Sequence, residues 1–572
     1  MYILGIHGWP KREHDSSACL IKDGKIIAMA EEERFTRKKH AFDSVPINAT
    51  LFCLDQAKIT LDKVDIVSIG YDRKKLCSLR GIPFDLSDQE VLETLLPKKY
   101  FNYTKYPKLR MIDHHLAHAA SSYYTSGFKE AAVLIIDGQG EDCSASLGYA
   151  LDGKINLFTK ISIQNSLGYF YESISKFLGF GLHGAGKVMG LAAYGDSQKY
   201  QMDSYTNNNS TYEFKPTKSI EIFNIKNESI DEQGIIIEAW VKYFMKELKL
   251  SPINNSYSYN HKTGRKEENS WTPTEDAKNL AASAQDLTED ILLFLCQVLK
   301  ERTESNNLVI SGGVGLNCSA NGRIVRSGIF NNVFIFPAAN DAGVALGSSL
   351  KVYYEKAKYD PCEITDVYLG PSFSNDTVEQ ILKRDKISYT YVKKIEQKTA
   401  ELLADGGIIG WFQGRMEVGP RALGNRSILA DPRSIKNRDL VNSVKNRESW
   451  RPLSPSIIEG FENQYFENPS MSRFMLMSYI VKKEASNKIP AVVHFDKTAR
   501  PQIVSKLDNK RYHKLITEFY KITDVPVLLN TSFNDRGKPI VCTPEDALKM
   551  FYSSPLDYLV IDNYLLIKKD PK

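Results

Sequence analysis

Residues 131–158 read AAVLIIDGQGEDCSASLGYALDGKINLF, and this stretch decides the fold because its arrangement also occurs at the start of the chain. An apolar strand leads into a polar loop, and a hairpin with Asp152-Gly153 at its turn follows. Residues 2–30 have the same order, with Asp23-Gly24 at the corresponding turn. The two turns are 129 positions apart, which predicts one unit occurring twice, with two unrelated hairpins as the alternative. Duplicated units place two loops across a cleft, where a nucleotide phosphate can bind.

Length and charge limit the classes of function. The chain has 572 residues, 25% charged and 42% hydrophobic, which predicts two to four globular units. Its 74 Lys and Arg against 69 Asp and Glu leave a net charge of +5, too little for general coating of nucleic acid or an anionic membrane. Any anion binding is therefore local.

The cysteines and the N-terminus indicate a cytoplasmic protein. The eight cysteines show no CxxC spacing, which predicts reduced thiols instead of a disulfide framework or a thiolate zinc site. Residues 1–10 have neither the hydrophobic core nor the cleavage site of a signal peptide. No apolar run approaches the roughly 20 residues that span a bilayer.

The order of elements predicts two domains. We expect a long helix at 277–300 and strand-loop-helix passages at 308–324 and 333–350, where glycines let the backbone approach an anion. The polar stretches 204–210 and 251–270 are expected to be exposed loops. The chain turns polar after Tyr354 and carries Pro361 and Pro371, which predicts a linker with its boundary between 355 and 370, so the domains are expected to span 1–358 and 359–572. In the second, Thr543 and Pro544 predict a helix start.

Two constellations indicate chemistry. His114 and His118 are four positions apart on one face of an expected helix, where two imidazoles can share a metal ion; a hydrogen-bonded pair is the alternative. Asp137 and Asp341 follow strands, where an Asp is also a common turn former. Together the four suit iron, manganese or zinc, and sequence does not choose among these metals.

The second constellation is cationic. Residues 415–451 contain nine Lys or Arg against four acids, spread among glycines and prolines, which predicts convergence on a compact polyanion. A solvated basic face and nucleic-acid binding are the alternatives, although aromatic residues are few. Arg500 and the segment Asn530–Asn534 add polar groups suited to a phosphate. The residues thus indicate an enzyme with two anion sites.

Several motifs together carry a family resemblance. They include EHDSSACLIKDG, EEERFTRKKH, HHLAHAASSYY, GKVMGLAAYG, SGGVGLNC, NDAGVALG, GRMEVGPRALGNRSILADPR, WRPLSP and NTSFN. Nearly end to end, the chain resembles the O-carbamoyltransferase family, which includes nodulation-factor, cephamycin and tobramycin carbamoyltransferases. The resemblance implies an α/β protein with a duplicated actin-like (ASKHA) N-terminal domain and a YrdC-like C-terminal domain. The second would make carbamoyl adenylate from ATP, with Mg²⁺, and carbamoyl phosphate; the first would transfer the carbamoyl group to a hydroxyl.

The resemblance also assigns roles to residues. His14 matches the general base, for which a neutral imidazole is suited near pH 7. Arg415 is a weaker candidate for an anion contact. Positions matching the family's metal ligands, commonly Fe(II) or another divalent metal, are His114, His118, Asp137 and Asp341. Positions matching the adenylate pocket are Lys39, Gly138, Gly313 and Asn317. Positions matching contacts to carbamoyl phosphate and ATP are Arg421, Lys445, Arg451, Arg500, Asn530 and Ser532, of which Lys445, Arg500 and Ser532 are expected to be catalytic.

The acceptor is the least determined part. We expect a small secondary metabolite with a free hydroxyl, neither nucleic acid nor a membrane as partner, and consider a homodimer. Acceptor contacts are expected in 71–106 and 204–270; Glu228, Asp231 and Glu232 would suit a polycationic acceptor, with a solvated acidic turn as the alternative. Sequence leaves open whether Asp142 and Cys143 touch the pocket. The rival functions are a threonylcarbamoyl-tRNA-type modification enzyme, a silent ATP-binding protein and a sugar or acetate kinase.

Overall fold

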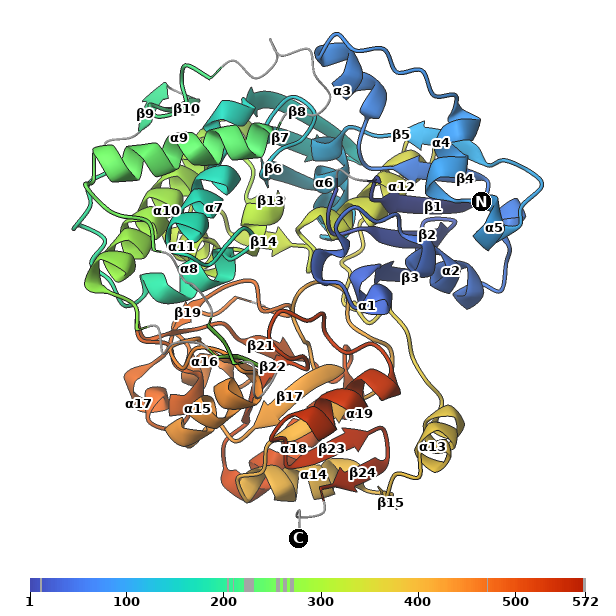
Figure 1. Ribbon diagram of the computed structural model, residues 1–572, viewed down its shortest axis with the longest axis vertical. Helices are drawn as coiled ribbons and strands as arrows, with labels where there is room; N and C mark the ends of the chain where they lie inside the picture. The colour runs from blue at the N-terminus through green and yellow to red at the C-terminus, as the bar shows by residue number, and fades with distance from the viewer. Residues whose placement is uncertain are drawn as a thin grey trace.

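The computed structural model describes residues 1–10, 13–202, 205–208, 210–220, 231–253, 258–260, 265–267, 272–470 and 472–568. Within these residues the protein is a mixed α/β fold with three large sheets (Figure 1). Two lie side by side in the N-terminal part, and the third, drawn in orange and red, lies below them. None of the described helices is long and apolar enough to cross a membrane.

The two N-terminal sheets have the same topology. The first has the order β3-β2-β1-β4-β5, with β1 antiparallel to β2 and parallel to β4. The second has the order β8-β7-β6-β13-β14, with β6 antiparallel to β7 and parallel to β13. The first comprises β1 Tyr2–His7, β2 Ser17–Lys22, β3 Lys25–Glu31, β4 Ile66–Ile69 and β5 Lys108–Met111; the second comprises β6 Glu130–Ile136, β7 Ala145–Leu151, β8 Lys154–Ile161, β13 Asn307–Ser311 and β14 Asn332–Ile335. The predicted duplication is confirmed, and this pair of sheets is the duplicated actin-like architecture.

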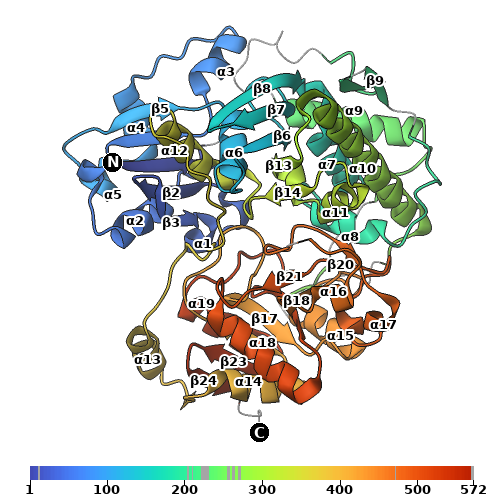
Figure 2. The ribbon, with the colours of Figure 1, turned by 180° about the vertical axis from the view of Figure 1, so that it is seen from behind.

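Helices α6 and α12 pack against each other between these sheets (Figure 2). Close packing requires glycines here, since a Cβ on Gly5 of β1 would lie 1.8 Å from the Ala345 carbonyl of α12, and one on Gly347 would lie 1.9 Å from the Ala117 carbonyl of α6. The helices of this part are α1 Glu33–Thr36, α2 Ile47–Gln56, α3 Arg73–Leu79, α4 Asp88–Leu95, α5 Lys98–Phe101, α6 His114–Tyr123, α7 Leu167–Phe177, α8 Ala185–Ala192, α9 Glu232–Lys246, α10 Glu275–Thr303, α11 Cys318–Ser327 and α12 Val344–Tyr354.

Short elements complete the N-terminal part. The helix expected at 277–300 is α10, and both strand-loop-helix passages are present. The expectation of a loop at 204–210 is wrong: β9 pairs with β10, because Tyr212 and Phe214 of β10 are buried and anchor the hairpin. The stretch expected as a loop at 251–270 lies mostly outside the described residues, although β11 and β12 fall within it. These strands are β9 Tyr205–Asn208, β10 Thr211–Phe214, β11 Ser258–Asn260 and β12 Arg265–Glu267; the short 3-10 helices are η1 Lys39–Ala41, η2 Leu61–Lys63, η3 Ile163–Asn165, η4 Gly313–Leu316 and η5 Asp341–Gly343.

The C-terminal part is built on a mixed sheet with the order β15-β24-β23-β16-β17-β22-β18-β21. Helix α19 begins at Pro544 behind a Thr543 capping box, as predicted. The strands of the C-terminal part are β15 Thr390–Tyr391, β16 Ile409–Phe412, β17 Arg426–Ala430, β18 Ser454–Ile458, β19 Tyr479–Ile480, β20 Thr498–Ala499, β21 Gln502–Val504, β22 Val527–Ser532, β23 Tyr558–Ile561 and β24 Tyr564–Ile567. The helices of the C-terminal part are α13 Asn375–Arg384, α14 Ile395–Ala404, α15 Ile435–Val444, α16 Glu462–Tyr465, α17 Lys483–Ser486, η6 Pro490–Val492, α18 Lys510–Thr523 and α19 Pro544–Ser553. This is the α/β unit for which the resemblance implied a YrdC-like fold; the boundary at 358/359 stays a prediction.

Candidate active site

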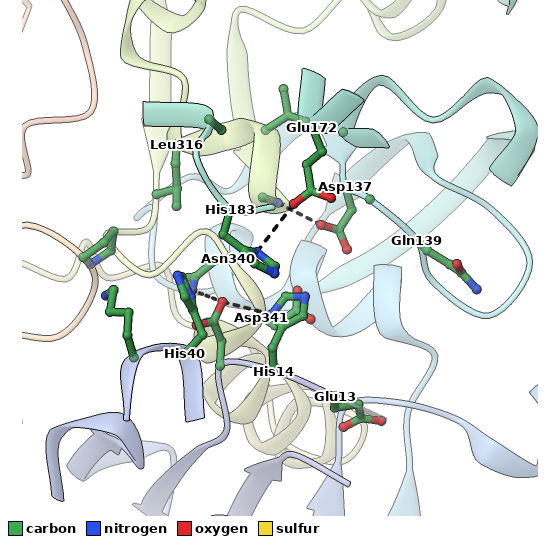
Figure 3. Close-up of a pocket in the computed structure, with 18 of the residues that line it drawn as sticks. Glu13, His14, His40, Asp137, Gln139, Glu172, His183, Leu316, Asn340 and Asp341 are labelled. Atoms are coloured by element: carbon green, nitrogen blue, oxygen red, sulfur yellow. Dashed lines mark hydrogen bonds and ion pairs between the residues drawn. The ribbon is translucent and has the colours of Figure 1, made fainter. Parts of the chain in front are cut away.

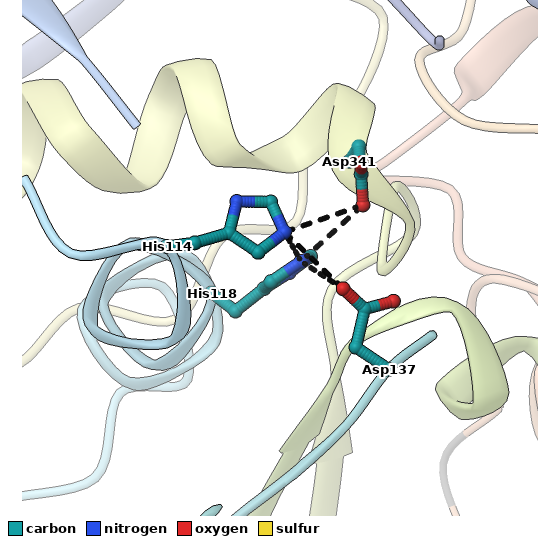
Figure 4. Close-up of side chains that lie close together, drawn as sticks. All are labelled: His114, His118, Asp137 and Asp341. Atoms are coloured by element: carbon teal, nitrogen blue, oxygen red, sulfur yellow. Dashed lines mark hydrogen bonds and ion pairs between the residues drawn. The ribbon is translucent and has the colours of Figure 1, made fainter. Parts of the chain in front are cut away.

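Four side chains from three elements meet between the N-terminal sheets (Figure 4). His114 and His118 project from the first turns of α6, Asp137 follows β6, and Asp341 begins η5. The two His Nε2 atoms are 3.2 Å apart, and Asp137 Oδ2 lies 3.2 Å from His114 Nε2 and 3.6 Å from His118 Nε2. Asp341 Oδ1 lies 3.6 and 3.5 Å from the same two nitrogens. The fold therefore brings together all four predicted metal ligands.

Hydrogen bonds behind the cluster orient these side chains. His114 Nδ1 lies 2.9 Å from the Gly70 carbonyl oxygen, so it donates there and leaves the Nε2 lone pair facing the cluster. His118 Nδ1 lies 3.2 Å from Ser311 Oγ. The Gly313 N–H donates to Asp137 Oδ1 over 2.9 Å, which leaves Oδ2 for the cluster.

The cluster has the dimensions of a divalent metal site. The four ligand atoms lie within 4.8 Å of one another. For metal–ligand bonds of about 2.0–2.2 Å, adjacent ligand atoms are about 3.0–3.5 Å apart, close to the separations found. Burial and the His114 imidazole would lower the pKa of His118, but Asp137 and Asp341 raise it, so the carboxylates favour positive charge at this point. Two imidazoles and two carboxylates are compatible with iron, manganese or zinc.

Three further imidazoles lie beside this cluster (Figure 3). Asp15 bridges two of them, with Oδ2 3.2 Å from His14 Nδ1 and Oδ1 2.8 Å from His40 Nδ1. The ring of His183 lies 5.3 Å from His14 and 4.9 Å from His40, between centroids. Burial lowers the pKa of His183 to about 4, assisted by repulsion from His14 and His40.

The carboxylates around His14 govern its protonation. Burial would lower the pKa of His14, but the hydrogen bond with Asp15 and the charges of Asp341, Asp15 and Asp137 raise it to about 10. This field of carboxylates favours the imidazolium form. A positive charge that offsets the carboxylates would favour the neutral imidazole that accepts a proton.

A cavity of about 1070 Å³ connects the N-terminal site to the C-terminal part. Its N-terminal wall includes His14, Lys39 and both aspartates of the metal cluster, Asp137 and Asp341. Its C-terminal wall includes Arg421, Arg451, Ser532, Asn534 and Lys538. The acidic side and the cationic side therefore share one continuous space.

The arginine side chains at the cationic wall repel one another. Burial and the nearby Arg500 and Arg451 lower the pKa of Arg421 to about 9. Burial likewise lowers the pKa of Arg447, with Arg451 and Arg500 contributing. Because arginine stays charged in proteins, this repulsion raises the affinity of the wall for an anion instead of removing its protons.

Two family models and several known proteins match most of this chain. The family model described as carbamoyltransferase N-terminus matches residues 2–77 and 88–350, and that described as carbamoyltransferase C-terminus matches residues 400–568. The chain belongs to the carbamoyltransferase family. The nodulation protein NolNO of Sinorhizobium fredii is 36% identical over 97% of this chain and 79% of its own. The 3'-hydroxymethylcephem-O-carbamoyltransferase of Amycolatopsis lactamdurans is 27% identical over 96% of this chain and 97% of its own.

A protein of Synechocystis sp., uncharacterized protein sll1178, is 36% identical over 99% of this chain and 97% of its own. Among solved structures, full-length HypF in its phosphate- and nucleotide-bound form has a TM-score of 0.31 and 14% identity, and the match covers 63% of this chain and 56% of that one. The family membership confirms the resemblance derived from the motifs.

The positions expected to form the adenylate pocket of this carbamoyltransferase all line the cavity. Lys39 Nζ lies 3.1 Å from Glu33 Oε1. A side chain on Gly138 would lie 3.0 Å from the Tyr169 ring, so glycine leaves the cavity open there. Asn317 caps α11, and its amide donates to Gln285 Oε1 over 3.0 Å. The lining positions are Lys39, Gly138, Gly313 and Asn317.

Only some of the C-terminal residues that are predicted to contact carbamoyl phosphate and ATP face the cavity. Arg421, Arg451 and Ser532 line it. Lys445 is buried behind Ser532 and donates to the Ser532 hydroxyl and carbonyl and to two oxygens of Asn534. Lys445 therefore shapes the loop after β22 from behind.

Two other predicted residues lie behind the cationic wall. Arg500 donates from Nη2 to Ser454 Oγ over 3.0 Å, beside Arg421. Asn530 is buried and donates to Ser456 Oγ over 3.0 Å, while its Oδ1 has no hydrogen-bond partner among the described residues. Their direct contact with a nucleotide stays a prediction.

The expected convergence of nine cations is only partly correct. Arg415 donates to the carbonyls of Leu369 and Gly370 and, over 3.2 Å, to that of Ile27, so it joins the two parts of the chain away from the cavity. Arg426 is buried and donates to the carbonyls of Gln413, Gly414, Asn425 and Pro371. These arginines support loops because their donors find backbone carbonyls, a distinction that sequence spacing does not make.

The acidic residues considered for binding the acceptor differ in their positions. Asp231 and Glu232 line the cavity, and Glu228 lies outside the described residues. Glu232 is buried, pairs with Arg80 at 2.8 Å and accepts from Gln139, so it is not part of a solvated turn. Asp231 caps α9 through the Gly234 N–H.

Two residues left open by the sequence do not line the cavity. Asp142 pairs with Lys75 and Lys160 at 3.1 and 2.7 Å. Cys143 is buried, with Sγ 3.3 Å from His115 Nδ1.

Four further residues line the cavity although no sequence-based prediction singled them out: Asp15, His40, Glu172 and His183. The adjacent letters HD in the EHDSSA motif were a usable signal for Asp15. His183 had none, because its proximity to His14 arises only from the fold.

Proposed function

We propose that this carbamoyltransferase forms carbamoyl adenylate from ATP and carbamoyl phosphate and transfers the carbamoyl group to a hydroxyl of a small secondary metabolite. The observation that carries the proposal is the shared cavity, which has a metal-ligand cluster in one wall and an arginine cluster in the other. A relative named as an O-carbamoyltransferase of a hydroxymethylcephem supports a hydroxyl acceptor.

The first half-reaction belongs to the cationic wall. Water cleaves carbamoyl phosphate to carbamate and phosphate; a carbamate oxygen then bonds to the α-phosphorus of ATP, and the bond to the bridging β-phosphate oxygen breaks. Pyrophosphate leaves, and Mg²⁺ would accompany the nucleotide. Arg421 and Arg451 offset the charge that collects on the phosphates, with Arg500 beside them. Lys445 holds Ser532 at the cavity surface.

The second half-reaction belongs to the His14 end. The acceptor oxygen bonds to the carbamoyl carbon, the bond from that carbon to the adenylate oxygen breaks, and AMP leaves. The acceptor proton passes to His14, whose Nδ1 is held by Asp15. A divalent ion, Fe(II) in our proposal, held by His114, His118, Asp137 and Asp341 would supply positive charge that binds the adenylate phosphate and offsets the carboxylates raising the pKa of His14.

The instability of the intermediates explains why both half-reactions would share one cavity. Carbamate and carbamoyl adenylate hydrolyse readily in water, so an intermediate released to solvent is lost. A continuous cavity allows the adenylate to pass from the arginine wall to His14 without leaving the protein.

The test is pyrophosphate release from the purified protein with ATP and carbamoyl phosphate in the absence of acceptor, with mass spectrometry for carbamoyl adenylate. We expect both products, and none when carbamoyl phosphate is omitted. Formation of ADP, or no turnover with metal present, would contradict the proposal and favour a kinase or a binding protein. A gel shift with bulk tRNA would favour a tRNA acceptor over a small molecule.

A further inference from the structure

A loop of the C-terminal part is held by side chains of the N-terminal part. The Gly419 N–H donates to Glu31 Oε1 over 2.7 Å, and Arg34 Nη2 donates to the Gly419 carbonyl over 2.8 Å. Glu31 and Arg34 also pair with each other, and both are buried. Both hydrogen-bonding groups of one peptide residue are thus fixed by partners 388 and 385 positions away.

Gly419 is suited to this contact because it has no side chain. Its φ is +89°, and a Cβ there would lie 2.5 Å from the Pro337 carbonyl of the N-terminal part. Arg421, two residues further on, lines the cavity. The position of this cavity arginine therefore depends on how Glu31 and Arg34 hold the loop.

From Arg34 a continuous series of polar contacts leads to the candidate base. Arg34 Nη1 lies 3.3 Å from Glu33 Oε1, and Glu33 Oε2 accepts from the His40 N–H over 2.7 Å. His40 Nδ1 lies 2.8 Å from Asp15 Oδ1, and Asp15 Oδ2 lies 3.2 Å from His14 Nδ1. This polar chain, from Gly419 through Glu31, Arg34, Glu33, His40 and Asp15 to His14, joins the two ends of the cavity.

We propose that Glu31 and Arg34 are positioning residues that fix the Arg421 loop relative to the His14 end, so that carbamoyl adenylate stays in the cavity between its formation and its transfer. The inference rests on the proposed function. The charges of Arg34, Glu31 and Glu33 are buried together, so displacement of Gly419 disturbs the pairing of Arg34 with Glu31.

The test measures loss of the intermediate without any acceptor. With ATP and carbamoyl phosphate, each pyrophosphate released reports one adenylate formed. AMP reports its loss: a water oxygen bonds to the carbamoyl carbon, the bond to the adenylate oxygen breaks, and AMP and carbamate leave. We expect the unmodified protein to release AMP slowly after its first pyrophosphate. Within this first turnover, Arg34→Met should raise the ratio of AMP to pyrophosphate about fivefold, within the range of coupling residues.

A second variant distinguishes loss of positioning from misfolding. Glu31→Gln retains a side-chain oxygen for the Gly419 N–H but loses the charge opposite Arg34, so we expect a smaller rise in the same ratio. A merely structural defect would lower pyrophosphate and AMP together and leave their ratio unchanged. Melting temperatures of both variants identify any that fail to fold.

Arg37→Met is the matched control. Arg37 lies in the same segment and also reaches the C-terminal part, donating to the carbonyls of Pro539 and Ile540 over 2.8 and 2.6 Å, but it is not in the polar chain. We expect its AMP-to-pyrophosphate ratio to equal that of the unmodified protein. An unchanged AMP-to-pyrophosphate ratio in folded Glu31→Gln would overturn the inference but not the proposed function. A rise in Arg37→Met equal to that in Arg34→Met would do the same. No pyrophosphate from the unmodified protein would overturn the proposed function and the inference with it.

Discussion

Lys445 lies buried behind the cationic wall, where its positive charge is unfavourable. Burial lowers its pKa well below the usual value, and repulsion from Arg447 and Arg451 adds to this. The unfolded chain therefore binds more protons than the folded one between the two pKa values, so the free energy of unfolding rises with pH in that interval. An anion bound at the wall raises the pKa of Lys445 because it favours the ammonium form of this side chain.

Pyrophosphate binding should therefore be accompanied by proton uptake at Lys445. Calorimetric titrations of the protein with pyrophosphate, in buffers of different ionisation enthalpy, should reveal this uptake, and affinity should fall as the pH rises through the pKa of Lys445. In Lys445→Gln the proton uptake should disappear. The exposed Lys436→Gln is the control and should behave like the unmodified protein. Uptake that persists in Lys445→Gln would assign the titration to another group.

Single residues differ in how far the sequence predicted them. His114 and His118 were predictable because their spacing places them on one helix face. Glu31 and Arg34 were not, because their partner Gly419 is almost 400 positions away and offers only backbone groups, which leave no pattern in the sequence. For the same reason Arg426 was grouped with the anion-binding cations although it serves backbone carbonyls.

At the scale of elements, the connection between β13 and α11 controls the metal cluster. Gly312 has a φ of +94°, and a Cβ there would lie 2.1 Å from the Ile136 carbonyl. The next residue, Gly313, donates its N–H to Asp137 Oδ1. Any shift of this connection is therefore transmitted to a predicted metal ligand.

Gly312→Ala should cost more than about 2 kcal/mol in the free energy of unfolding, because it combines a strained φ with a backbone clash. It should also weaken metal binding. Gly328→Ala is the control: Gly328 has a φ of +68° in open space, so only about 1 kcal/mol is expected there. Urea unfolding and metal analysis measure both effects, and equal losses in the two variants would disprove the role of the Gly312 contact.

Elements with local signals were predicted well. The Asp-Gly turns specify their hairpins locally, and the capping box of α19 is written in four consecutive residues. The β9–β10 hairpin was missed because the stretch 204–210, SYTNNNS, which contains β9, is rich in Asn, a residue with little β propensity. Its stability comes instead from tertiary packing, in which the Phe214 ring lies 5.0 Å from the buried Trp240 ring.

At the scale of the whole molecule, the duplicated sheets were predictable from the repeat, but the shared cavity was not. The segment 31–40 supplies Glu33, Lys39 and His40 to the cavity and also Arg37 to the C-terminal part. This double role depends on how the N-terminal and C-terminal parts pack against each other, and no local sequence pattern predicts it. The arrangement implies two half-sites with separate chemistry in one space.

The half-sites should therefore be separable by mutation. Arg500→Ala should abolish pyrophosphate release because the cationic wall loses a charge beside Arg421, while its metal content stays unchanged. His118→Ala should lower metal content about tenfold or more, because one of four ligands is lost, and should retain pyrophosphate release. His14→Asn should likewise retain it, since this residue acts only in transfer. Arg384→Ala, an exposed arginine paired with Asp385, is the control and should preserve both properties. Metal analysis and a pyrophosphate assay on the same preparations measure the two losses. If Arg500→Ala and His118→Ala lost the same property, the cavity would hold one site with a single function, and the division into an adenylate-forming wall and a transfer wall would be wrong.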